Sequence, residues 1–372
     1  MRVLLSHPYF WPHVLRGAER EVHDVGTGLA ARGHDVRLLT GQPSGLTSTT
    51  RYGGMRVRYV RSPLPAALRR RGVSPEAAFA PFAAAGAAFS GADVVVSYHY
   101  ADAYGVEVAD RAVRRRRPHV LKLTGAVPRW YLDQHGTRTD QALLRRALDR
   151  ADEVWVNSPY VAEAMADWGV PMQVVPAGID DAAFVPCADR AAEPVVLCTA
   201  APEEPRKRLP DLLDAWPAVL DALPGARLEL AQEVSAPTRE ALLGRVPEQL
   251  RDTVSFLGRL AGQDLAEAYS RAWVTVAPAA YEALGLATLE ALACGTPVAG
   301  ARSGATPWLL EVAGTGALYE PGDTAGLAAA VVKGAGLAQV PTTRDTCRAA
   351  AQRFAWPGIL DDVERRLESL VR

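Results

Sequence analysis

The stretch Tyr281–Gly300, YEALGLATLEALACGTPVAG, places two carboxylates among alanine and leucine residues. Glu282 and Glu290 flank Gly285, and an unpaired carboxylate in such apolar surroundings is energetically costly. The run ATLEALACG, which ends in glycine, predicts a helix, and VTVAPA just before the quoted stretch predicts a strand. Two interpretations follow. Either a helix carries two solvated glutamates, or a ligand site lies at a strand-to-helix turn.

The length and composition of the chain indicate an ordinary globular protein of two domains. Its 372 residues are too many for one hydrophobic core, and 49% of them are apolar. A net charge of −1 does not favour a nucleic-acid partner. The four cysteines are scattered without a CxxC pair, which argues against disulfides and a zinc site. Since no apolar run is long enough to span a membrane and no signal peptide precedes the first strand, we expect a cytoplasmic protein.

Short apolar runs alternate with longer helical patterns along the chain, which is the βαβ rhythm of parallel sheets covered on both faces. The rhythm starts at RVLLS and restarts at PVVLCTA, after a polar segment at 186–194. We therefore expect an α/β fold with two doubly wound, Rossmann-like domains facing a cleft. Residues 1–185 would form the first domain and residues 186–355 the second, followed by an amphipathic helix at 356–372.

Ligands of doubly wound sheets bind beyond the carboxyl ends of the strands, so strand-to-helix turns are the candidate sites. In the first turn, SHPYFWPHVLRGAEREV, Gly17 precedes a helix and either admits an anion or is an ordinary helix start. The second turn, APEEPRKRLPDLLDAW, gathers Arg206, Lys207 and Arg208 ahead of a helix. These cations form either a diphosphate clamp or a solvated charge run.

The third turn is the one quoted at the outset. Backbone N–H groups of Leu284, Gly285 and Leu286 would lie at the helix start and favour an anion. The carboxylates of Glu282 and Glu290 accept hydrogen bonds and therefore suit hydroxyl groups. A nucleotide sugar carries both kinds of group. The glycine-rich segments GTGLAARG and GAGLAQ lack the setting of a dinucleotide fingerprint, so a nicotinamide-dependent enzyme is a weak alternative.

These residues resemble the retaining glycosyltransferases of family 4, which have the GT-B fold and use nucleotide-diphosphate sugars. The resemblance rests above all on Glu282-x7-Glu290 with Gly285 inside it, supported by ERE after Gly17 and by the Lys207 loop. It extends over most of the chain, including VVPAGIDDAAF, VSFLGRL and GALYEPGD. It implies a first domain that binds the acceptor, a second that binds the nucleotide sugar, and a C-terminal helix that crosses back to the first. It implies no cofactor and no metal.

The resemblance also implies a role for each candidate residue. Lys207 would neutralise the departing diphosphate, Glu282 would hold hydroxyls of the donor sugar, and Glu290 would hold the ribose. The implied donor-binding residues are Gly17, Arg206, Arg208, Gly258, Arg259, Glu282, Leu284, Gly285, Leu286 and Glu290, with Gly258 and Arg259 bordering the base.

The chain departs from the family pattern at several positions. Pro202 stands where an arginine is usual, and Ala177 and Trp308 replace an asparagine and an acid. Thr124 stands where a histidine is common near the donor sugar, and His99 is expected to take over part of that role. His99 and Thr124 therefore join Lys207 and Glu282 as candidate catalytic positions, and we expect an unusual donor sugar or acceptor.

The acceptor is expected on the first domain, near Trp11, Arg16, Trp130 and Tyr131, although packing would also explain these residues. We expect transfer to a small-molecule acceptor in secondary metabolism, such as antibiotic biosynthesis. One alternative is a peripheral membrane enzyme acting on a lipid or envelope glycan, supported by PLPAALRRRG and the arginine run at 114–117. Another is a nucleotide-sugar-binding protein without transfer activity. The donor sugar, the base and the oligomeric state stay open.

Overall fold

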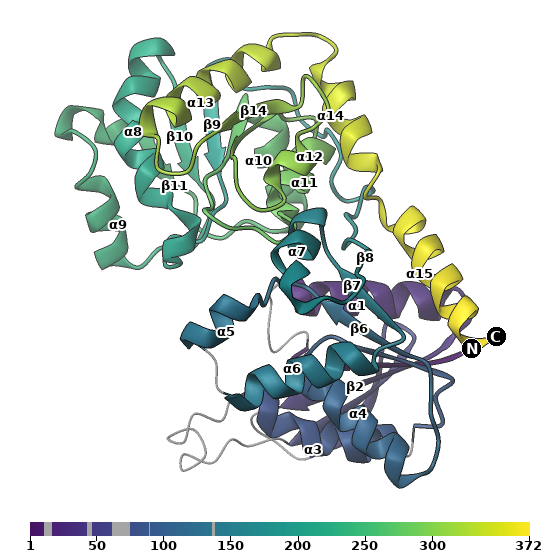
Figure 1. The fold of residues 1–372 in the computed structure, drawn as a ribbon. Coiled ribbons are helices and arrows are strands. Elements are labelled where there is room, and N and C mark those ends of the chain that lie inside the picture. The colour runs from purple at the N-terminus through teal and green to yellow at the C-terminus, as the bar shows by residue number, and fades with distance from the viewer. Residues whose placement is uncertain (11–16, 43–46, 62–74, 89, 136–137) are drawn as a thin grey trace. The chain divides into compact units, whose positions relative to one another are not determined.

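The structure is a computed structural model that describes residues 1–10, 17–42, 47–61, 75–88, 90–135 and 138–372. It divides into two compact units, Met1–Ala177 with Pro357–Arg372, and Gly178–Trp356 (Figure 1). The sequence placed the boundary between Val185 and Pro186, whereas the units divide between Ala177 and Gly178. Trp11, Arg16 and the segment PLPAALRRRG lie outside the described residues.

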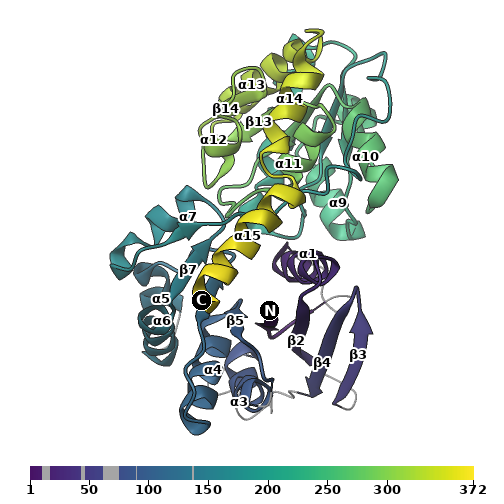
Figure 2. The same ribbon diagram turned by 90° about the vertical axis from the view of Figure 1, so that its right-hand side faces the viewer.

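The first unit is built on a sheet with the strand order β3-β4-β2-β1-β5-β6-β7-β8. All neighbouring strands are parallel except β3 and β4, which form an antiparallel pair at one edge (Figure 2). Because β1 pairs with β2 on one side and with β5 on the other, the strand order reverses at β1. The strands are β1 Arg2–His7, β2 Asp35–Gln42, β3 Ser48–Tyr52, β4 Met55–Arg61, β5 Val94–Ser97, β6 His119–Leu123, β7 Glu153–Val156 and β8 Gln173–Val174.

Helices cover both faces of this sheet. Gly26 of α1 lies against Leu5 and Met55, whereas α3 and α4 bury Leu4 and Leu39 on the opposite face. The helices are α1 Gly17–Ala31, α3 Pro75–Ala88, α4 Tyr100–Ala112, α5 Arg129–His135, α6 Arg138–Arg150 and α7 Pro159–Ala164, with a 3-10 turn at Ala166–Trp168.

The C-terminal helix α15, Trp356–Val371, returns to the first unit as expected. It packs on α1, where a Cβ built on Gly28 would lie 2.4 Å from Leu360. Glu364 accepts a hydrogen bond from Arg32 and pairs with His34, each at 2.7 Å. This packing and charge pairing explain why the last residues belong to the first unit rather than to the second.

The second unit contains a parallel sheet with the strand order β11-β10-β9-β12-β13-β14. The chain order reverses between β9 and β12, which is the doubly wound topology that the βαβ rhythm predicted. The strands are β9 Val195–Cys198, β10 Arg227–Leu230, β11 Val254–Phe256, β12 Val274–Ala277, β13 Val298–Ala301 and β14 Gly316–Tyr319.

The central strands β9, β12 and β13 of this sheet are fully or largely buried because helices cover both faces. Trp216 and Tyr269 are the largest fully buried side chains of the unit. The helices are α8 Leu209–Ala222, α9 Ala236–Leu243, α10 Gly262–Arg271, α11 Leu286–Ala293, α12 Thr306–Leu309, α13 Thr324–Ala338 and α14 Thr343–Gln352, with 3-10 turns at Pro205–Lys207 and Glu248–Thr253. In the described part of the chain, no helix has the length and apolar character needed to cross a bilayer.

Candidate functional site

Two loops of the second unit bring several candidate residues together. One loop follows β9 and the other follows β12, and these two strands are neighbours where the strand order reverses. Their carboxyl ends therefore open at the same edge of the sheet. The loops are joined by a hydrogen bond of 2.8 Å from the Ala280 N–H to the Arg206 carbonyl.

Lys207 and Glu282 form an ion pair between these loops. The Nζ of Lys207 donates a hydrogen bond to Oε1 of Glu282, and the two side chains are 20% and 21% exposed. The Arg206 guanidinium lies 3.8 Å from the second carboxylate oxygen of Glu282 and donates to the Tyr281 carbonyl at 3.2 Å. The pair holds the partly exposed Lys207 ammonium group at the end of a 3-10 turn, where the two loops meet.

A third loop, after β13, fixes the backbone of Glu282. The Ala305 N–H donates to the Glu282 carbonyl at 2.9 Å, and the Ser303 hydroxyl donates to the Ala280 carbonyl. Gly304 has a φ of 60°, and a Cβ built on it would lie 2.2 Å from the Glu282 carbonyl oxygen. Only glycine therefore fits beside Glu282, a constraint that sequence reasoning missed.

Replacing Gly304 with alanine is expected to displace the Glu282 segment and to reduce donor turnover. The clash involves backbone atoms, and the positive φ adds strain, so we expect about 1–3 kcal/mol of lost stability as well. Gly336→Ala is a matched control, because its Cβ would meet no atom within 4 Å and its position is helical. Thermal unfolding and donor turnover are the measurements. Equal behaviour of the two variants would contradict the packing of Gly304 on Glu282.

The start of α11 offers backbone donors next to this pair. Gly285 occupies the N-cap position with a φ of 96°, and no side chain among the described residues caps the helix. The first N–H groups of a helix lack intrahelical acceptors and carry the positive end of the helix dipole. Leu284 is buried and anchors the turn, while Leu286 opens the helix. The predicted anion-binding turn thus lies beside Lys207 and Glu282.

Glu290 lies further along α11, where its side chain is buried. The Tyr269 hydroxyl donates to the Glu290 carboxylate at 3.2 Å and lies 3.1 Å from the Thr199 hydroxyl, just after β9. Burial raises the pKa of Tyr269 well above its ordinary value, and the Glu290 charge raises it further. Tyr269 therefore remains a protonated donor to Glu290. Tyr269 is a second residue that sequence reasoning missed.

Of the remaining donor candidates in the second unit, Arg208 directly follows Lys207, whereas Gly258 and Arg259 follow a different strand. Arg208 has a φ of 49° and directs its guanidinium to Asp211 at 2.6 Å. Gly258 and Arg259 follow β11, at the edge of the sheet, and Arg259 is exposed. No interaction among the described residues links Arg259 to the Lys207–Glu282 pair.

The first unit carries the other predicted positions. Gly17 opens α1. His99 caps α4 by accepting a hydrogen bond from the Ala101 N–H at 3.2 Å, and the Thr124 carbonyl accepts one from Asn157 at 3.3 Å. Because β5 and β6 are neighbouring parallel strands, His99 and Thr124 both follow carboxyl ends at the same edge of the sheet.

The aromatic pair Trp130 and Tyr131 lies on α5, with ring centroids 6.1 Å apart. Trp130 is 59% exposed and Tyr131 is 45% exposed. Burial in a core therefore does not account for these two residues.

Lys122, Glu21 and Asn157 form a buried charged network next to Thr124. The sequence did not predict this network. Lys122 is 1% exposed, with its Nζ 3.0 Å from Glu21 and 2.5 Å from Asn157. Burial lowers the pKa of Lys122, while the Glu21 charge opposes that effect. Asn157 also donates to Glu21 at 3.1 Å, so the network connects α1 to the turn that carries Thr124.

Comparisons with known proteins identify both units. Residues 15–183 match the family described as Glycosyltransferase Family 4, and residues 193–335 match Glycosyl transferases group 1. A D-inositol 3-phosphate glycosyltransferase from Saccharomonospora viridis is 34% identical over 174 residues, which span 44% of this chain and 40% of that protein.

Solved structures share the fold over nearly the whole chain. Sucrose-phosphate synthase from Thermosynechococcus elongatus has a TM-score of 0.80 at 22% identity, covering 99% of this chain and 98% of that one. HepE from Anabaena, in complex with UDP, has a TM-score of 0.75 at 19% identity, covering 99% of this chain and all of that one (100%). The two doubly wound units are those of the GT-B fold. The chain belongs to the family 4 glycosyltransferases.

Proposed function

We propose that this protein is a retaining glycosyltransferase that moves a sugar from a nucleotide-diphosphate sugar to a small polar acceptor. The observation that carries the proposal is the Lys207–Glu282 pair at the carboxyl ends of β9 and β12, beside the start of α11. Cations and helix N–H groups suit a diphosphate, and carboxylates suit hydroxyl groups. One edge of the sheet thus carries the groups that a nucleotide sugar requires.

The reaction breaks the bond between the anomeric carbon and the diphosphate oxygen and forms a bond to the acceptor oxygen on the same face. The acceptor proton passes to the departing phosphate oxygen. Negative charge grows on the diphosphate, so Lys207, Arg206 and the N-terminus of α11 stabilise the transition state. Glu282 holds the donor sugar by its hydroxyls. We expect these fixed charges to act without a metal.

The first unit is the proposed acceptor side. Exposed Trp130 and Tyr131 suit the face of a sugar ring or of a small polycycle. D-inositol 3-phosphate glycosyltransferase and sucrose-phosphate synthase are both named for small phosphorylated compounds, which supports a small polar acceptor. A place in secondary metabolism rests on the sequence prediction alone.

A thermal-shift panel tests the donor half of the proposal. We expect one of UDP, GDP, dTDP or ADP, or one of their sugars, to raise the unfolding temperature by a few degrees, because saturating ligand adds about 2–4 kcal/mol to the folded state. HepE was solved with UDP, which makes the uridine series the first to measure. Slow hydrolysis of the same nucleotide sugar without acceptor would distinguish an enzyme from a binding protein. A chain that responds to none of the nucleotides would contradict the proposed donor site.

A further inference from the structure

A cavity with both leucine and arginine side chains in its lining lies in the first unit, on the face of the sheet that α3 covers. It has a volume of about 180 Å³ and is lined by Arg37, Arg56, Arg58, Thr49, Ser90 and Leu39, among others. That volume is about six times the share of one water molecule in the liquid, which leaves room for a small polar group. The cavity is distinct from the Lys207–Glu282 site of the second unit.

The strand register explains why three arginines meet here. Arg37 of β2 is paired with Arg56 of β4, and Arg58 of β4 is paired with Thr49 of β3. Residues directly opposite each other on neighbouring strands share a face, and side chains two apart on one strand also share it. Arg37, Arg56, Arg58 and Thr49 therefore project from the same face of the sheet.

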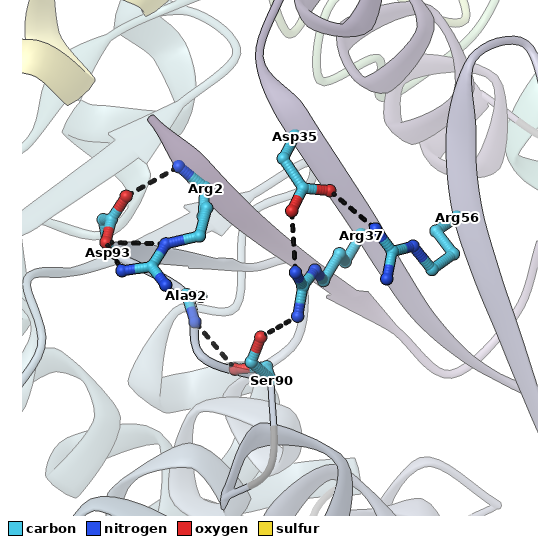
Figure 3. Close-up of polar contacts among 7 residues, drawn as sticks. All are labelled: Arg2, Asp35, Arg37, Arg56, Ser90, Ala92 and Asp93. Carbon is cyan, nitrogen blue, oxygen red and sulfur yellow. Dashed lines mark hydrogen bonds and ion pairs between the residues drawn. The ribbon is translucent and has the colours of Figure 1, made fainter.

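The arginines are only partly neutralised (Figure 3). Asp35 is the shared partner of two of them, with its carboxylate 2.7 Å from Arg37 and 3.4 Å from Arg56. Arg37 also donates to the Ser90 carbonyl, and nearby Arg2 is paired with Asp93 at 2.6 Å. Three arginines and one aspartate leave a net charge of +2 around the cavity.

Two donors have no protein acceptor within the described residues. The Nε of Arg37 is buried and makes no hydrogen bond there. Arg58 is exposed at the cavity and has neither an ion pair nor a hydrogen bond in the same residues. A buried donor without an acceptor is costly, and like charges on one face repel. An anion in the cavity would relieve both costs.

We propose that this cavity binds the phosphate group of a phosphomonoester or diphosphate. Guanidinium groups donate in a fork that matches phosphate oxygens, and the Thr49 hydroxyl adds a further donor. Arg37 is near the amino end of β2, whereas substrates of doubly wound sheets bind at the carboxyl ends. The cavity is therefore an accessory site that tethers a phosphorylated molecule, either a free metabolite or a lipid headgroup.

The test is a calorimetric titration of the full chain with inorganic pyrophosphate. Arg58→Ala is expected to weaken pyrophosphate binding about tenfold or more, the effect of losing a charge-assisted hydrogen bond, and Arg58→Lys to restore part of it. Arg365→Ala is the matched control, since Arg365 is exposed on α15 of the same unit and does not line the cavity. The Arg58 variants leave the proposed donor site unchanged, so pyrophosphate bound there should contribute equally in all of them. Lys207→Ala alters that donor site and should retain the Arg58-dependent binding. Unfolding temperatures of the variants report folding.

Sedimentation with phosphatidylcholine vesicles, with and without phosphatidic acid, identifies the source of the phosphate. Arg58-dependent pelleting with phosphatidic acid would assign a lipid headgroup, and pyrophosphate binding without pelleting would assign a soluble metabolite. Equal pyrophosphate affinity in the wild type, Arg58→Ala and Arg365→Ala would overturn the proposal. The proposal would also be overturned if the protein bound no pyrophosphate and Arg58→Ala pelleted with phosphatidic acid vesicles as the wild type does.

Discussion

Lys207→Ala should lower kcat for glycosyl transfer by about 10²–10³-fold, comparable to the loss of one preorganised donor at a developing charge. The Lys207 ammonium group is held against Glu282 and is partly exposed at the strand-end edge. Charge on the leaving diphosphate grows in the transition state, so the cation contributes more there than in the ground state. The Michaelis constant for the donor should rise as well, because bound diphosphate already carries negative charge.

The matched control is Lys333→Ala. Lys333 is an exposed lysine on α13 of the same unit and takes no part in the proposed donor site. Turnover of the nucleotide sugar identified by thermal shift is the readout, and unfolding temperature confirms that both variants fold. Lys207→Arg should retain part of the activity, because it keeps the charge with a different geometry. A near-normal kcat for Lys207→Ala would remove Lys207 from the mechanism.

The fold was predictable because its central strands are buried on both faces. Strands such as β5 and β9 appear in the sequence as the largely apolar runs VVVS and VVLC, and such runs are typical of parallel sheets covered by helices on both faces. The boundary between the units was less predictable. Ile179 forms a bridge with Ala355 and therefore belongs to the second unit, but that contact joins residues far apart in the sequence. The sequence-based boundary relied on the change in composition at 186–194, and composition does not reveal the contact between Ile179 and Ala355.

The candidate site was predictable only as far as its loops. Parallel strand order at the switch point was enough to bring the Lys207 loop close to the Glu282 turn. Gly304 and Tyr269 come from other elements, and their contacts with Glu282 and Glu290 depend on how β13 and α10 pack. For Arg208, the sequence prediction overlooked a partner that is close in the chain. Its partner Asp211 is only three residues away, so a local pairing competes with the diphosphate role that the sequence suggested.

Glu290→Gln is expected to weaken nucleotide binding about 10–100-fold, because hydrogen bonds to a charged acceptor contribute about 1.5–3 kcal/mol. Glutamine keeps the size of the side chain, so the packing of α11 is preserved. It loses the negative charge and replaces one acceptor oxygen with a donor. Isothermal titration with the preferred nucleotide is the measurement. Glu267→Gln is the control, since Glu267 is exposed on α10 of the same unit.

The alternative is that Glu290 serves only to satisfy Tyr269. The Tyr269 hydroxyl is buried, and without an acceptor it would cost about 1–3 kcal/mol. Tyr269→Phe separates the two roles, because it removes the hydroxyl and keeps the carboxylate. If Glu290 binds the nucleotide, Glu290→Gln should lose affinity far more than Tyr269→Phe, and its unfolding temperature without nucleotide should change little. If Glu290 is purely structural, both variants should unfold at lower temperature and bind nucleotide as the wild type does.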